Sequence, residues 1–116
     1  MESNTQYDVK SISKTLYDLT TSCASLDDYL DVAFDFRYKS ISITPLQKKN
    51  EILTLLEVLS QNRPKKLMEI GTSNGGTLFL LCKVASDDAE IISIDLPEGP
   101  YGGKMYPDWK VPFYET

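Results

Sequence analysis

The residues best suited to chemistry lie in one stretch, Glu69-Ile70-Gly71-Thr72-Ser73-Asn74-Gly75-Gly76-Thr77, which Asp95 follows. Glycines in such a stretch let a chain turn sharply from a strand into a helix, and let its backbone approach a ligand closely. A helix that opens near Gly76 would present unpaired N–H groups and the positive end of its dipole. Asp95 stands at the spacing at which an acidic residue accepts hydrogen bonds from ribose hydroxyls. The pattern predicts a nucleotide-type cofactor site.

Two side chains in this stretch indicate which cofactor would bind. A dinucleotide motif would place glycines at positions 71, 73 and 76, but position 73 is a serine. The Cβ of Ser73 fills the space in which the backbone would close on a pyrophosphate. The carboxylate of Glu69 would repel a pyrophosphate and attract a cation. S-adenosylmethionine carries a sulfonium and an ammonium group and no phosphate, so the charges favour this cofactor.

Two other interpretations stay open from the residues alone. The chain could belong to an NAD-type oxidoreductase, although Ser73 and Glu69 disfavour it. It could also be a non-catalytic interaction module with a degenerate cofactor site, in which Gly71 to Gly76 form an ordinary turn.

The composition excludes several kinds of chemistry. The chain has no histidine, which is the commonest general base and transition-metal ligand. Its two cysteines, Cys23 and Cys82, lack the spacing of a zinc site or a redox pair. Asp27, Asp28 and Asp31 are expected on the solvated face of a helix. No metal site is predicted, and no residue is nominated as catalytic.

Hydrophobic patterning supplies the elements that would position the site. Residues 66–70 and 90–94 are predicted strands, the second rich in β-branched residues. Residues 77–85 are apolar nearly all round, which is typical of a helix buried against a sheet. Together they form one βαβ unit, whose two strands should be parallel. We therefore expect an α/β fold with a Rossmann-like parallel βαβ unit.

The front of the chain is predicted to be helical. Asn4 or Thr5 would cap a first helix that runs to about Thr20. Ser25, followed by Asp28, would cap a second amphipathic helix.

A third helix is predicted to begin in the stretch Thr44-Pro45-Leu46-Gln47. The first and last side chains of this stretch would cap each other, and its proline would occupy the first helical position. The expected organisation is a helical N-terminal cap over residues 1–43 and the N-terminal half of a cofactor-binding domain over residues 44–116. Residues from Pro97 onward are rich in proline and glycine and are predicted to form loops.

At these residues the chain resembles the class I S-adenosylmethionine-dependent methyltransferases. Their first motif is an acidic residue followed by spaced glycines after the first strand. Glu69, Gly71 and Gly75 match that motif, whereas Ser73 stands where the middle glycine is usual. The sequence of residues 69–77 resembles that of the methyltransferase subset that acts on small molecules and sugars, including cephalosporin hydroxylase-like proteins. The resemblance extends from about Thr44 to Tyr106.

The resemblance implies a role for these residues and a reaction. The residues implied to bind S-adenosylmethionine are Glu69, Gly71, Thr72, Ser73, Asn74, Gly75, Gly76, Asp95 and Leu96. Residues 71–75 would line the methionine part of the cofactor, Glu69 would lie near its amino group, and Asp95 would bind its ribose. The implied reaction is transfer of a methyl group to a small-molecule acceptor, over which the N-terminal helices would form a variable cap.

The sequence supplies only part of such a domain. An open sheet typically has about five or six strands, whereas only two strands are predicted here. Two parallel strands leave edges that need covering. The chain is therefore expected to be an incomplete methyltransferase domain, either a fragment of a longer protein or a homo-oligomer that completes its sheet with another copy.

Length, charge and hydropathy indicate the size of the domain, its partners and its location. A chain of 116 residues has the size of one domain or of part of one. A net charge of −5 argues against a nucleic acid or an anionic membrane as partner. The sequence contains no apolar run long enough to span a bilayer and no signal-peptide pattern, so a cytoplasmic location is expected.

Overall fold

The computed structural model describes residues 8–96, and the predicted loops from Pro97 onward lie outside this range. The described part is mixed α/β, with four helices and one two-stranded sheet. In chain order the elements are α1 (Val9–Thr20), α2 (Leu26–Asp35), α3 (Lys49–Asn62), β1 (Lys66–Ile70), α4 (Gly76–Val84) and β2 (Glu90–Ile94).

The sheet has the predicted strands and the predicted direction. β1 pairs with β2 in parallel, in a register that runs from Lys66 opposite Glu90 to Ile70 opposite Ile94. Parallel neighbours need a crossover connection, which α4 provides. The expected βαβ unit is therefore confirmed.

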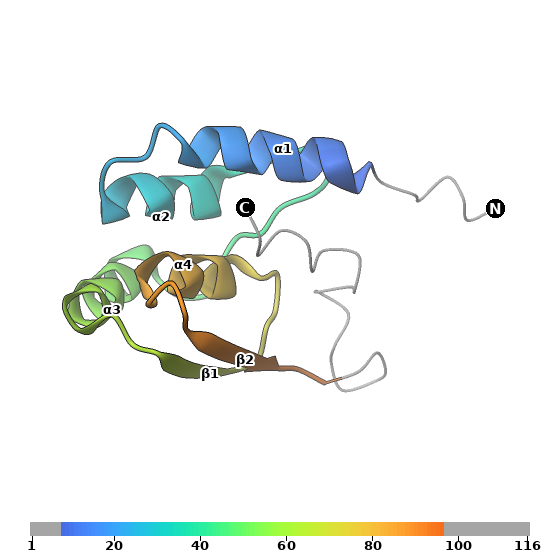
Figure 1. Cartoon of the computed structure of the whole chain (residues 1–116). Helices are drawn as coiled ribbons and strands as arrows, with labels where there is room; N and C mark the ends of the chain where they lie inside the picture. Colours follow the sequence, from blue (N-terminus) through green and yellow to red (C-terminus); the bar gives the residue numbers. More distant parts are fainter. Residues whose placement is uncertain (1–7, 97–116) are drawn as a thin grey trace.

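The elements form layers, which Figure 1 shows from the side. α1 and α2 lie in the upper layer, α3 and α4 lie in the middle, and the two strands lie below them. α4 contacts both α2 and α3. Its residues Leu78, Phe79 and Leu80 are all buried, although they point in different directions around the helix. The nearly uniform apolar character of this helix follows from its central position.

One hydrophobic core joins the N-terminal helices to the βαβ unit. The buried residues of this core are Ile12, Leu16, Leu30, Ala33, Phe36, Ile41, Ile43, Ile52, Leu56, Phe79, Leu80 and Val84. They come from α1, α2, α3, α4 and the segment between α2 and α3. The segment expected to be a cap is therefore packed directly on the helices of the predicted cofactor-binding half.

Local capping decides where the first two helices begin. α1 begins at Val9, because the Asp8 carboxylate accepts a hydrogen bond from the Ser11 amide at 3.1 Å. The prediction that Asn4 or Thr5 caps this helix is therefore wrong. The prediction for α2 is confirmed, since the Ser25 hydroxyl accepts from the Asp28 amide at 3.3 Å.

The predicted start of α3 is wrong for a different reason. The helix begins at Lys49, and Thr44 and Gln47 do not cap each other. The Thr44 hydroxyl instead accepts a hydrogen bond from Arg37 at 3.1 Å, and the Gln47 side chain accepts one from the Thr77 hydroxyl of α4 at 2.6 Å. Both side chains that would have formed the local cap therefore hydrogen-bond to residues outside it.

Within residues 8–96, no helix combines the length and apolar character needed to cross a membrane.

Candidate cofactor site

The glycine loop, residues 71–75, connects the carboxyl end of β1 to the first turn of α4. Its first amide, that of Gly71, donates to the Ile94 carbonyl at 2.6 Å, which attaches the loop to the tip of β2. Gly71, Ser73 and Gly75 have positive φ values of 91°, 54° and 97°. The sharp reversal that the glycines predicted therefore occurs here, at the edge of the sheet where ligands of α/β proteins bind.

The Asp95 carboxylate lies against this loop. Its Oδ2 accepts a hydrogen bond from the Ser73 amide at 3.1 Å, and its Oδ1 accepts one from the Leu96 amide at 2.8 Å. The structure thus brings together three of the predicted site residues, one from the glycine loop and two that directly follow β2. Leu96 is 55% exposed.

A hydroxyl network connects Glu69 to the same loop. The Ser93 hydroxyl donates to the Glu69 carboxylate at 2.9 Å and lies 2.6 Å from the Thr72 hydroxyl. Because a hydroxyl has one proton to donate, Thr72 is the donor in its bond with Ser93. Glu69 and Ser93 are directly opposite each other in the strand register. This network links Thr72, which is buried, to side chains of both strands.

The surroundings of Glu69 include the charge of Asp95. Burial raises the pKa of Glu69, the hydrogen bond from Ser93 lowers it, and the negative charge of Asp95 raises it further. Within residues 8–96, neither carboxylate forms an ion pair with a basic side chain. The carboxyl edge of the sheet therefore carries two acidic groups whose negative potential would attract a cation.

Gly71 of the loop and Gly76 at the start of α4 have different surroundings. A Cβ added to Gly71 would meet nothing within 4 Å, so the backbone there borders open space. A Cβ added to Gly76 would overlap the Ile43 carbonyl oxygen and would lie 2.7 Å from the Pro45 ring. Of these two glycines, Gly71 is the one that a ligand could approach, whereas Gly76 permits close packing inside the protein.

The segment that crowds Gly76 consists of residues 43–47, here called the 43–47 segment. The Asn74 side-chain amide donates to the Thr44 carbonyl at 3.1 Å, and Thr77 donates to Gln47. Of the predicted site residues, Asn74 and Gly76 therefore contact this segment.

The sequence pattern did not indicate that Ser93, Thr44 and Gln47 are hydrogen-bond partners of residues 69–77. A signal for Ser93 existed, because the inward positions of β2 are Ile91 and Ser93, and Ser93 is the polar one, opposite Glu69. No comparable signal existed for Thr44 and Gln47, whose spacing fits a local helix cap.

Among residues 8–96, the structure brings together no group of three or more His, Cys, Asp or Glu side chains that could hold a metal.

Comparison of the chain with protein-family models, with curated proteins and with solved structures found no match in any of the three. The function is therefore inferred from the arrangement of the chain's own residues.

Proposed function

We propose that this chain is the S-adenosylmethionine-binding part of a Rossmann-like methyltransferase that acts on a small-molecule acceptor. The observation that carries the proposal is the pairing of a glycine loop with two carboxylates, Glu69 and Asp95, at the carboxyl edge of a parallel sheet. The cofactor is cationic at its sulfonium and at its ammonium group. A site with this charge suits such a ligand.

The residues present fit an adenosine-containing ligand. A carboxylate has about four lone-pair positions, and the Asp95 carboxylate uses one on each oxygen for the Ser73 and Leu96 amides. It keeps enough acceptor capacity for the two ribose hydroxyls. The open space at Gly71 lies at the start of the same loop, where the methionine part would pass.

The same geometry disfavours an NAD-type oxidoreductase. In a dinucleotide site the loop amides face a pyrophosphate, whereas here the Ser73 amide donates to the Asp95 carboxylate. A pyrophosphate at this place would also meet the negative charges of Glu69 and Asp95.

When bound, S-adenosylmethionine supplies a methyl group on a sulfonium, which an acceptor atom takes by in-line displacement. Asp95 would hold the ribose and Glu69 would balance the positive charge of the methionine part. Glu69 is held in place by Ser93. These residues contribute by orienting the donor, which is the main way such a site lowers the barrier.

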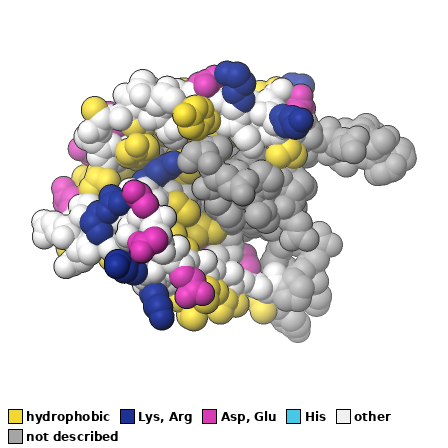
Figure 2. Space-filling view, in the orientation of Figure 1, with side chains coloured by type: hydrophobic (Ala, Val, Ile, Leu, Met, Phe, Trp, Pro, Cys, Tyr) yellow, Lys and Arg dark blue, Asp and Glu magenta, His cyan; other side chains and the backbone are white. Residues whose placement is uncertain are grey.

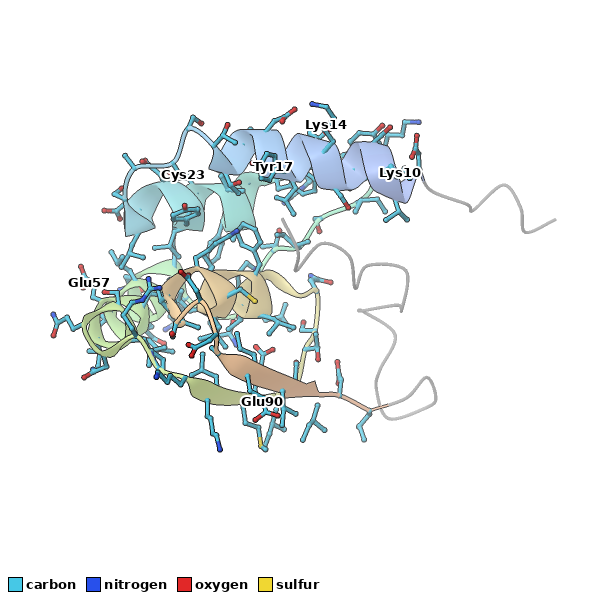
Figure 3. All side chains as sticks on the ribbon, in the orientation of Figure 1. Lys10, Lys14, Tyr17, Cys23, Glu57 and Glu90 are labelled. Carbon is cyan, nitrogen blue, oxygen red and sulfur yellow. The ribbon has the colours of Figure 1, made fainter. Side chains whose placement is uncertain are left out.

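Isothermal titration calorimetry with S-adenosylhomocysteine tests the proposal directly. The wild-type chain should bind this product, and Asp95→Ala should weaken binding by about 10- to 100-fold, because hydrogen bonds to a charged group are lost. Glu57→Ala is the matched control, since Glu57 is an exposed acid on α3, away from the sheet edge (Figure 3). Its affinity should equal that of the wild type.

Two results would contradict the proposal. Binding of NAD in place of S-adenosylhomocysteine would identify an oxidoreductase site. A folded chain that binds neither ligand would favour a non-catalytic interaction module. Circular dichroism of each variant separates these results from loss of folding.

A further inference from the structure

The sheet has an apolar outer face. The helices lie on one side of β1 and β2, and side chains project from the other side, where Figure 3 labels Glu90. The outward residues are Lys66, Met68 and Ile70 of β1 and Glu90, Ile92 and Ile94 of β2. Met68 is 61% exposed and Ile70 is 84% exposed, and hydrophobic side chains border the lower edge of the described part in Figure 2. We call these six residues the outer face.

We propose that the outer face binds the outer face of a second copy of this chain, with a twofold axis that runs parallel to the strands. Such an axis places β1 of one copy over β2 of the other without changing the strand direction. The strand register then sets the contacts, since Lys66 is level with Glu90 and Ile70 is level with Ile94. Lys66 of each copy meets Glu90 of the partner subunit, and the four apolar side chains of each copy pack between the sheets.

The outer faces of two copies could also stack about a twofold axis that runs across the strands. The charges of Lys66 and Glu90 favour the axis along the strands. An axis across the strands would reverse their direction and place Lys66 over Ile70 of the partner subunit, which would bury a charge against an apolar side chain. The axis along the strands instead places Lys66 opposite Glu90 of the partner subunit, at the same height along the strands. The outer face is therefore self-complementary, as an isologous interface must be.

Stacking differs from extension of the sheet at an edge. Edge pairing would satisfy unpaired backbone groups, but it would leave Met68, Ile70, Ile92 and Ile94 in water. Packing of two sheets at about 10 Å covers those side chains. Within residues 8–96 the sheet has two strands, so the contact is small and the association should be weak.

Sedimentation velocity of the full 116-residue chain, from about 10 µM to about 1 mM, should show a monomer–dimer equilibrium. Ile70→Glu should raise the dimer dissociation constant by more than about tenfold, because it places a charge in the apolar layer. Val58→Glu is the control, since Val58 is 54% exposed on α3 and lies outside the outer face. Its dissociation constant should match that of the wild type. Circular dichroism checks that each variant is folded.

A mixture of two charge variants tests the axis. Lys66→Glu alone and Glu90→Lys alone each place like charges opposite one another in the dimer, and each should weaken it by about three- to tenfold. A mixture of the two variants forms a heterodimer in which both charge pairs attract, so the mixture should associate more tightly than either variant alone. A wild-type chain that stays monomeric at all concentrations would overturn the proposal. So would a dimer that Ile70→Glu leaves intact, or a mixture no tighter than its components.

Discussion

The Asp95 carboxylate and the Ser73 amide, 3.1 Å apart, join the tip of β2 to the middle of the glycine loop. Ser73 has a φ of 54°, a left-handed conformation that costs a non-glycine residue about 1 kcal/mol. The hydrogen bond from its amide offsets part of this strain. Asp95 therefore shapes the loop as well as facing the proposed ribose position.

Replacement of Asp95 should lower stability even without a ligand. Asp95→Ala removes the acceptor for the Ser73 and Leu96 amides, and we expect the free energy of unfolding in urea to fall by about 1 kcal/mol. The control Glu57→Ala should change it by less than about 0.5 kcal/mol. Equal stability of the two variants would contradict a structural role for Asp95.

Glycine at position 76 should be required by packing. Alanine is normally more favourable than glycine inside a helix by about 1 kcal/mol, yet Gly76→Ala would drive its Cβ into the Ile43 carbonyl and the Pro45 ring. We expect a loss of about 2 to 3 kcal/mol in the free energy of unfolding. Gly71→Ala meets open space and should lose only about 1 kcal/mol through its positive φ. A larger loss for Gly71→Ala than for Gly76→Ala would contradict this packing.

Ionisation of Glu69 should oppose folding. Burial and the charge of Asp95 raise the pKa of Glu69 above its ordinary value of 4.5, so between the two values the folded state holds more protons than the unfolded state. The contribution of Glu69 to stability therefore falls as the pH rises through that window. Glu69→Gln keeps an acceptor for Ser93 and removes this loss. Its stability relative to the wild type should increase from about pH 3.5 to about pH 8 in urea titrations, and an unchanged difference would refute the prediction.

Both thiols should react slowly in the folded protein. Burial is the main cause that raises the pKa of Cys23 and of Cys82, with the nearby acids Asp28 and Glu69 adding to it. At about pH 8, each should react with a disulfide reagent about tenfold more slowly in the folded chain than in urea. Single Cys→Ser variants assign the two rates. A thiol that reacts equally fast in both states would show that its environment does not raise the pKa.

Much of the fold was predictable because its determinants are local. The strands over residues 66–70 and 90–94, the buried helix α4 and the Ser25 cap follow from patterns within about ten residues of chain. The start of α3 was not predictable in this way. Gln47 had a local partner available in Thr44, and only the arrival of Thr77 from α4, thirty positions along the chain, replaced it.

The sequence by itself determined the βαβ unit, the glycine loop and the acidic residue at the end of β2, because periodicity and turn chemistry act between near neighbours. The tertiary structure alone decided which contacts each of these residues makes. Gly71 borders open space and Gly76 packs against the 43–47 segment, although the two glycines are only five positions apart in the chain. The tertiary structure also set Ser93 between Glu69 and Thr72, because strand register brings together residues that are far apart in the chain.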